Sequence, residues 1–297
     1  MTDSLDVLNR RFGLKQALQF TLGKGGLPVA EVLTPLGNGC IALQGAQVLD
    51  WQPVGQLPVI WVSKAAQYAA GKAVRGGVPV CWPWFGAREG LPAHGFARTC
   101  MWQVRGTSQR VSGEVVLRLG LTDNVTTRAL WDFAFDLELA VTMGTSLSLV
   151  LTTRNTGHQA FTLTQALHTY FCVNDITQTQ IQGLDNCNYL DKVQNFARHQ
   201  QTGAVTFTDE TDRVYIDTTS DCLIDDRAAQ RRVRVAKSGS TSTVVWNPWS
   251  ERERALADMT AGAYKTMVCV ETCNTGPDQI SLLPAGLHSL GAIISVA

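Results

Sequence analysis

Short segments in which apolar and polar residues alternate recur along most of the chain. In Phe135-Asp136-Leu137-Glu138-Leu139 the apolar and acidic positions interleave, which is typical of an antiparallel strand with one buried face. Turn-forming residues at 143–146 and 155–157 separate such segments from each other. The pattern predicts strands over residues 41–51, 58–63, 101–108, 114–122, 133–143, 146–155, 161–172, 205–208, 213–217, 221–225, 231–236, 243–246, 266–274 and 288–296.

Helical spacing is confined to two short stretches. Leu5, Leu8 and Phe12 predict a helix over residues 4–12, and residues 250–256 predict a second one with Ser250 as its N-cap. We find no fixed-period repeat, low-complexity tract or linker that would divide the chain. Many short strands in one continuous pattern favour an all-β sandwich or barrel that forms a single domain over residues 1–297.

Composition and charge narrow the class of protein. A hydrophobic fraction of 45% in 297 residues supports a large core. The 25 basic and 25 acidic residues cancel, so no global field attracts nucleic acid or an anionic membrane, and an anionic ligand requires a local cluster. The chain starts without a basic segment followed by an apolar one, and no apolar run is long enough to span a bilayer.

The eight cysteines form no Cys-x-x-Cys pair, and several lie in strand-like apolar runs, as buried free thiols do. We therefore expect a reducing, cytoplasmic setting. A zinc site made by Cys269, Cys273 and a distant histidine is conceivable, but the spacing is poor, and we predict no metal. The chain also lacks a Gly-x-Ser-x-Gly elbow, a Walker phosphate loop and a His-Glu-x-x-His motif.

The strand-like run from Met267 to Asn274 contains one carboxylate, Glu271. Because side chains alternate across a strand, Glu271 is expected on the same face as Cys269 and Cys273. Burying an ionised carboxylate is costly unless it is paired or hydrogen-bonded. This stretch alone is equally compatible with a structural glutamate and with a functional one.

A histidine could give this glutamate a function. His168 lies in an apolar segment where alternation places it on one face with Ala166 and Tyr170. A histidine there is more often a core residue, but opposite Glu271 it would complete an acid/base pair that is usable near neutral pH. The polar stretch 188–192 could in turn present Asp191 to ligand hydroxyls, or pair that carboxylate with a lysine at the surface.

Two glycine-containing loops carry arginines. Arg75 precedes two glycines, which permit close backbone approach, and three aromatic residues follow within ten positions. Aromatic faces suit the apolar C–H faces of a sugar ring and suit an ordinary core equally well. His94 and Arg98 lie in a loop just before a strand, where scaffolds carry functional groups, although such residues are usually solvated or capping.

Five segments, taken in order, resemble the glucose-6-phosphate 1-epimerase branch of the aldose 1-epimerase superfamily. The resemblance extends from about residue 30 to the C-terminus and leaves residues 1–29 as a lead-in. It implies a galactose mutarotase-like fold, an antiparallel β-supersandwich with a cleft across one face and few helices. The matching segments are Arg75–Pro79 with Trp82–Gly86, Pro92–Arg98, Leu167–Phe171, Trp246–Pro248 and Val270–Asn274.

The resemblance implies a role for each candidate residue. Glu271 would be the base that takes the anomeric hydroxyl proton, and His168 the acid that protonates the ring oxygen. Arg75 and Arg98 would bind a phosphate, for which guanidinium groups are suited. The remaining two site residues would be His94, bonding a hydroxyl or the phosphate, and Asp191, orienting the sugar.

The implied ligand is a small sugar phosphate, without nucleic acid, membrane, metal or cofactor, and we expect a monomer. One departure concerns Ala93, where some relatives carry Gln, which leaves hydroxyl specificity at that point open. Two other hypotheses remain. One is an aldose 1-epimerase for unphosphorylated sugars, against which the arginine pair argues. The other is a non-catalytic carbohydrate-binding module, which would leave a strand-borne glutamate and histidine without purpose.

Overall fold

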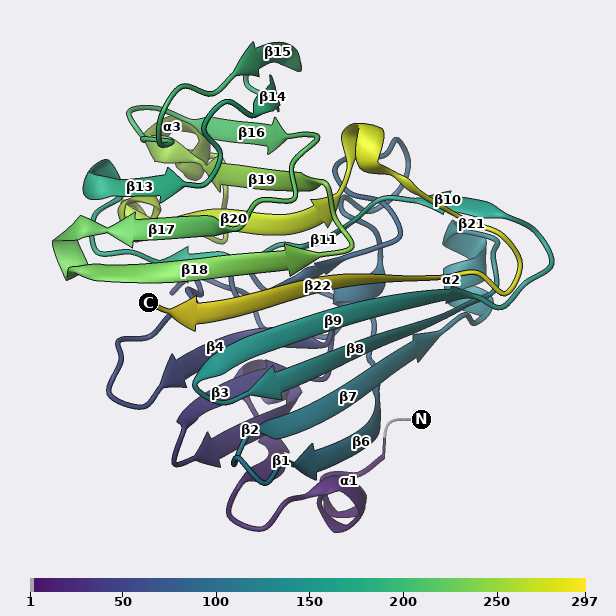
Figure 1. The fold of residues 1–297 in the computed structure, drawn as a ribbon. Coiled ribbons are helices and arrows are strands. Elements are labelled where there is room, and N and C mark those ends of the chain that lie inside the picture. The colour runs from purple at the N-terminus through teal and green to yellow at the C-terminus, as the bar shows by residue number, and fades with distance from the viewer. Residues whose placement is uncertain (1–2) are drawn as a thin grey trace.

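The computed structural model describes residues 3–297, and antiparallel strands make up most of it (Figure 1). The three α-helices in this range are short: α1 spans Leu5–Phe12, α2 Val125–Leu130 and α3 Trp249–Arg254. The strands are β1 (Leu18–Leu22), β2 (Pro28–Thr34), β3 (Gly37–Ala42), β4 (Gln47–Pro53), β5 (Val80–Cys81), β6 (Gln103–Gln109), β7 (Val115–Thr122), β8 (Phe135–Met143), β9 (Ser146–Asn155), β10 (Phe161–Leu163), β11 (Gln165–Leu167), β12 (Tyr170–Cys172), β13 (Thr179–Gln182), β14 (Asn188–Asp191), β15 (Ala197–Gln200), β16 (Thr211–Tyr215), β17 (Cys222–Asp226), β18 (Arg231–Ser238), β19 (Ser242–Asn247), β20 (Met267–Asn274), β21 (Ile280–Leu282) and β22 (Leu287–Val296).

Two eight-stranded sheets dominate the fold. In the first, the order is β15-β14-β16-β19-β20-β11-β5, with β12 also paired to β20; in the second it is β13-β17-β18-β22-β9-β8-β7-β6. Both sheets contribute side chains to one hydrophobic core. The first sheet provides Val268 and Val270 of β20, and the second provides Leu137 and Leu139 of β8, among others. Figure 1 shows β22, β9, β8 and β7 side by side, with β20, β19 and β16 stacked above them. The predicted all-β class is confirmed.

The N-terminal part of the chain forms a smaller sheet of its own. The predicted helix over residues 4–12 is confirmed as α1, which Ser4 caps by accepting a hydrogen bond from the Val7 N–H at 3.4 Å. Strand β1 then pairs with β2, so that Leu18 lies opposite Val32. Part of the segment expected to be only a lead-in therefore belongs to the four-stranded sheet β1-β2-β3-β4.

Several predicted strands are interrupted or shorter in the structure. The segment 41–51 is two strands, because the chain turns between β3 and β4 with Ala46 at a φ of 49°. Residues 58–63 and 205–208 form only isolated bridges, Ile60 with Phe171, Val62 with Gly76 and Val205 with Ile181. The second helix also begins earlier than predicted, since Pro248 and not Ser250 occupies its N-cap position.

No helix of residues 3–297 has the length and apolar character needed to cross a lipid bilayer. All eight cysteines lie within this range as free thiols, and four of them are buried.

Candidate active site

Glu271 lies on the face of β20 that is turned away from the main core. Val268 and Val270 belong to that core, whereas Cys269 and Cys273 pack in two smaller clusters on the other face, as alternation along the strand predicts. We call the second face the site face. It comprises Cys269, Glu271 and Cys273 of β20 and the residues directly opposite them on β19, which share their face: Trp246, Val244 and Ser242.

His168 reaches the site face from a turn that separates two short strands, β11 and β12. The continuous strand predicted over 161–172 is wrong, because the Thr169 N–H donates to the Leu167 carbonyl at 2.9 Å and makes a tight turn between β11 and β12. Both short strands still pair with β20. The His168 ring stacks on Tyr170, with centroids 4.9 Å apart and an interplanar angle of 10°. The turn thus brings His168 to Glu271.

The imidazole and the carboxylate form a buried pair. His168 Nε2 lies 3.4 Å from Glu271 Oε1, and the two residues are 8% and 1% exposed. The second atom of each group, His168 Nδ1 and Glu271 Oε2, is buried without a hydrogen-bond partner. Both groups of the pair are thus largely shielded from solvent, Glu271 more completely than His168.

Burial sets the protonation of this pair. Desolvation raises the pKa of Glu271 well above its ordinary value, an effect that Lys192 opposes. Desolvation also lowers the pKa of His168 well below its ordinary value, helped by the positive charges of Arg98 and Arg75. Burial therefore favours the protonated carboxyl and the neutral imidazole over the ionic pair.

Arg75 is held beside this pair by two partners. Its Nε donates to both carboxylate oxygens of Asp258 at 3.1 Å, and one terminal nitrogen donates to the Tyr170 hydroxyl at 3.1 Å. The same tyrosine stacks on His168 and, at 5.8 Å between centroids, on Trp61. Asp258 comes from the segment after α3, which the sequence analysis did not identify. Arg75 reaches the site with its charge already paired.

The two glycines after Arg75 are required by the backbone. Gly76 has a φ of 109°, and a Cβ there would lie 2.5 Å from Val62 Cα. Gly77 has a φ of 69°, and a Cβ there would lie 2.3 Å from the Val48 carbonyl oxygen. Only glycine combines these angles with such contacts. The close backbone approach predicted for this pair is confirmed.

His94 lies next to His168, with ring centroids 5.8 Å apart. Its Nδ1 accepts a hydrogen bond from the Gly86 N–H at 3.3 Å, so the ring proton is on Nε2. Desolvation, together with Arg98, Lys192 and Arg75, lowers the pKa of His94 to about 3. The residue is thus a neutral imidazole with one N–H that can donate to a ligand oxygen.

Arg98 supplies a cation whose Nε has no hydrogen-bond partner within the protein. One terminal nitrogen donates to the Ala93 carbonyl at 2.7 Å, while Nε is buried without a partner. Its positive charge lowers the pKa values of His94 and His168. Ala93 itself is exposed and holds Arg98 through its main chain, so that a change of side chain at this position leaves the contact possible.

Asp191 is not brought to this group of residues. It lies opposite Arg213 of β16, which in turn lies opposite Val245, and Val245 points into the main core. Asp191 is therefore on the face of the sheet opposite to Glu271. Its carboxylate accepts from the Val193 N–H at 3.0 Å and lies 3.8 Å from Arg213 Nε. These contacts turn Asp191 away from the site face.

A different carboxylate, Asp212 of β16, occupies the site face. It lies opposite Trp246, and its charge contributes to raising the pKa of Glu271. Asp212 Oδ2 is 2.7 Å from Lys192 Nζ, and its Oδ1 is buried without a partner. Desolvation raises the pKa of Asp212, and Lys192 opposes this. The sequence analysis missed this residue, because the strand that it predicted over residues 213–217 begins one position after Asp212, whereas β16 begins at Thr211.

The aromatic residues after Arg75 divide between core and site. Trp82 and Trp84 are buried in the main core. Phe85 is half-buried and faces the site instead, with its ring 5.0 Å from that of His94 and 5.7 Å from Lys192 Nζ. The core interpretation thus holds for the two tryptophans, and Phe85 is the one of the three that lies beside His94.

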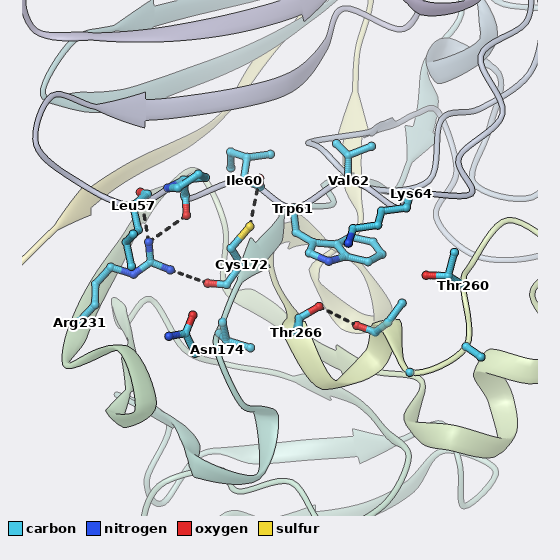
Figure 2. Close-up of a pocket in the computed structure, with 15 residues that line it drawn as sticks. Leu57, Ile60, Trp61, Val62, Lys64, Cys172, Asn174, Arg231, Thr260 and Thr266 are labelled. Atoms are coloured by element: carbon cyan, nitrogen blue, oxygen red, sulfur yellow. Dashed lines mark hydrogen bonds between the residues drawn. The ribbon is translucent and has the colours of Figure 1, made fainter.

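A pocket of about 610 Å³ adjoins the site through Trp61 (Figure 2). Trp61 and Lys64 line it on one side and Thr260 and Thr266 on the other. Arg231 is held at its edge by the carbonyls of Leu57, Pro58 and Cys172 (Figure 2). The indole of Trp61 separates this pocket from Tyr170 and His168, because its ring stacks on the tyrosine.

The fold and the site together define a class of protein: a large antiparallel β-sandwich that carries a buried histidine–glutamate pair among arginines. A family profile described as "Aldose 1-epimerase" matches residues 38–291. The chain belongs to the aldose 1-epimerase family.

Known proteins that resemble the chain agree with this family. A protein of Escherichia coli strain K12 that carries the name "Putative glucose-6-phosphate 1-epimerase" is 39% identical over 248 residues, 82% of each chain. A crystal structure titled as that of "a putative mutarotase (YeaD)" from Salmonella typhimurium superposes with a TM-score of 0.88 at 34% identity, covering 95% of this chain and 94% of the other. A galactose mutarotase related enzyme from Lactobacillus acidophilus, 13% identical, shares the fold with a TM-score of 0.71 over 91% of this chain and 97% of its own.

Proposed function

We propose that the protein interconverts the α and β anomers of a hexose 6-phosphate, with D-glucose 6-phosphate as the preferred candidate. The observation that carries the proposal is the buried pair of His168 and Glu271, 3.4 Å apart, next to a guanidinium with a free Nε, Arg98. The names of the relatives supply the substrate class. The reaction needs only proton transfer and positioning, for which this arrangement is suited.

The reaction leaves the number of protons on the pair unchanged. The proton on Glu271 first moves to His168, which forms the ionic pair. Glu271 then takes the proton of the anomeric hydroxyl while His168 donates its proton to the ring oxygen. The C1–O5 bond breaks, its electron pair stays on O5, and C1 becomes an aldehyde carbon. Rotation about C1–C2 and the reverse steps give the other anomer.

The charges around the pair would hold the substrate. Arg75 is paired with Asp258 and Lys192 with Asp212, so Arg98 is the cation with the most binding capacity left for a phosphate. His94 would donate from Nε2 to an oxygen of the ligand. Asp212 would take the sugar-orienting role that we expected of Asp191, because its Oδ1 has no partner on the site face.

The experiment is to follow anomer exchange by NMR, with D-glucose 6-phosphate and D-glucose as parallel substrates and buffer alone as the control. Wild type should accelerate exchange of the phosphorylated sugar above the spontaneous rate. Glu271→Gln and His168→Ala should each lose about 10²–10⁴-fold in kcat, the range for one positioned acid or base.

The possible outcomes separate the hypotheses. Equal acceleration of both sugars would support an aldose 1-epimerase for unphosphorylated substrates. Binding of either sugar without any acceleration would support a carbohydrate-binding module. If wild type catalyses exchange and both variants keep full activity, the residue assignment is wrong while the activity stands.

We further propose a monomer in a reducing cytoplasm. Eight free cysteines, half of them buried, support the reducing location, since free thiols persist where disulfides do not form. Light scattering coupled to gel filtration measures the mass directly, and a value near 32.3 kDa is expected.

A further inference from the structure

Three donor side chains converge at the site without full hydrogen bonding. His168, Cys269 and Glu271 each offer one ligand atom, and these three atoms all lie within 4.8 Å of one another. All three residues are buried. Glu271 Oε2 and His168 Nδ1 have no hydrogen-bond partner. A buried group of imidazole, thiol and carboxyl is the donor set that zinc and related soft divalent ions prefer.

We propose that His168, Cys269 and Glu271 form an inhibitory binding site for a thiophilic divalent cation such as Zn²⁺ or Cd²⁺. The site rests on side-chain positions alone, whereas its inhibitory effect rests on the proposed function of Glu271 and His168. On binding, the Cys269 thiol and the Glu271 carboxyl each release a proton to the buffer. A metal–sulfur and a metal–oxygen bond form in their place, and the neutral imidazole donates its lone pair.

The geometry needs only a small adjustment. Zinc bonds of about 2.0–2.3 Å place tetrahedral ligands roughly 3.5 Å apart. His168 Nε2 and Glu271 Oε1 already meet this separation at 3.4 Å. Cys269 Sγ lies within 4.8 Å of the other two ligand atoms, so it has to approach them by up to about 1 Å.

The neighbouring charges permit a cation here. Desolvation and the Glu271 carboxylate raise the pKa of the Cys269 thiol, whereas Arg75, whose charge is paired with Asp258 at 3.1 Å, lowers it. Lys192, whose charge lowers the pKa of Glu271, is likewise paired with Asp212 at 2.7 Å, and Arg98 is the neighbouring cation whose Nε stays without a partner. An ion bound by a thiolate and a carboxylate would carry little net charge, so it adds little repulsion to this environment.

Cys273 provides a matched control. It lies on the same strand and the same face as Cys269, two residues beyond Glu271 where Cys269 is two residues before it. Both thiols are fully buried. Cys273 differs in its surroundings, because its Sγ lies 3.4 Å from Ser242 Oγ and its atoms are not part of the three-donor group. The two cysteines therefore differ mainly in whether the thiol lies near His168, which is what the comparison tests.

The test is titration of the full-length protein with Cd²⁺, read by the ultraviolet thiolate-to-metal charge-transfer absorption and by calorimetry. Wild type and Cys273→Ser should bind one equivalent with the same affinity. Cys269→Ala should lose that equivalent or bind more than about tenfold more weakly. Cys269→Ser serves the same purpose if the alanine variant does not fold, as judged by circular dichroism. Mg²⁺, which prefers oxygen ligands, should not bind.

The outcomes distinguish this site from the proposed activity. Unchanged Cd²⁺ binding in both Cys269 variants, or equal loss in Cys269 and Cys273 variants, would overturn the metal site. If one equivalent binds through Cys269 and D-glucose 6-phosphate competes with it, the metal site and the sugar site coincide. If the metal binds through Cys269 and the sugar phosphate does not compete, the metal site stands and the inhibitory effect and the proposed sugar site fail.

Discussion

At the scale of single residues, burial shifts the proton affinities of Glu271 and His168 in opposite directions. The pKa of Glu271 is raised because ionising a carboxyl at 1% exposure is costly. His168 stays neutral for the same reason. An acid and a base with such displaced pKa values are typical of functional sites, and they also affect the stability of the folded protein.

Replacing Glu271 by Gln should stabilise the protein at neutral pH. The folded state raises the pKa of Glu271 above its unfolded value of 4.5, so the stabilising protonated form is fully present below pH 4.5 and is lost as pH rises through the folded pKa. Gln does not ionise. The variant's advantage in the free energy of unfolding should therefore appear above about pH 4.5 and grow with pH, to about 0.5–2 kcal/mol, with a corresponding rise in Tm. Thermal unfolding at several pH values measures it. Glu89→Gln, at an exposed loop position, should show no such trend.

Two aspartates should respond differently to the same substitution. Asp212→Asn removes a charge on the site face and should raise KM for the sugar phosphate by roughly 10–100-fold, the equivalent of one hydrogen bond to a charged group. Asp191→Asn changes a residue on the opposite face and should leave KM within about twofold while lowering stability by about 1 kcal/mol. The measurement is the KM of both variants from steady-state kinetics, which shows which of the two aspartates affects the sugar phosphate. The reverse order of effects would restore Asp191 as the sugar-orienting residue.

At the scale of elements, short strands and turns position the reactive groups. Alternation along 267–274 was sufficient to predict that Glu271 and the two cysteines share a face. The break at His168 depends on hydrogen bonds to Pro79 and within the turn, and the position of Asp212 depends on pairing between β16 and β19. Such pairings join distant segments, and a register shifted by one residue reverses the faces. Local patterns therefore singled out Glu271 and His168, which the fold brings to 3.4 Å from each other, but could not show that Asp191 lies on the opposite face of the sheet.

The glycine pair after Arg75 offers a test at this scale. Gly76→Ala should destabilise the protein by roughly 1–3 kcal/mol through its φ of 109° and its contact with Val62. It should also weaken sugar phosphate binding, because Arg75 would shift relative to Asp258. Gly90→Ala is the control: Gly90 has a φ of 69° but no atom within 4 Å of an added Cβ. Gly90→Ala should lower stability only through the strain of a positive φ, and it should leave the affinity for substrate unchanged.

At the scale of the whole molecule, one core connects the sheets. Residues of β1, β8, β20 and β22 all belong to the same hydrophobic cluster, with Trp82 at its centre against Phe96, Trp131 and Phe135. Hydrophobic content and strand pattern were enough to predict the β class. They could not predict the order of strands in the sheets, since that order is determined by contacts far apart in the chain.

A continuous core predicts that residues 1–297 unfold as one unit. Tryptophan fluorescence and far-ultraviolet circular dichroism should give coincident transitions in urea. Trp82→Ala should lower the free energy of unfolding by about 3–5 kcal/mol and shift both transitions equally. Two separated transitions, or a shift in only one signal, would show that the chain contains more than one domain.

The edge-on contact between Trp246 and His168 has a spectroscopic consequence. The two rings lie 6.1 Å apart at 81°, and Trp246 is half-buried on β19. A protonated imidazole is a stronger quencher of indole emission than a neutral one. The fluorescence intensity of Trp246 should therefore fall when the proton moves from Glu271 to His168 and rise when it returns. Rapid-mixing fluorescence could then time each turnover with no label attached to the protein or the sugar.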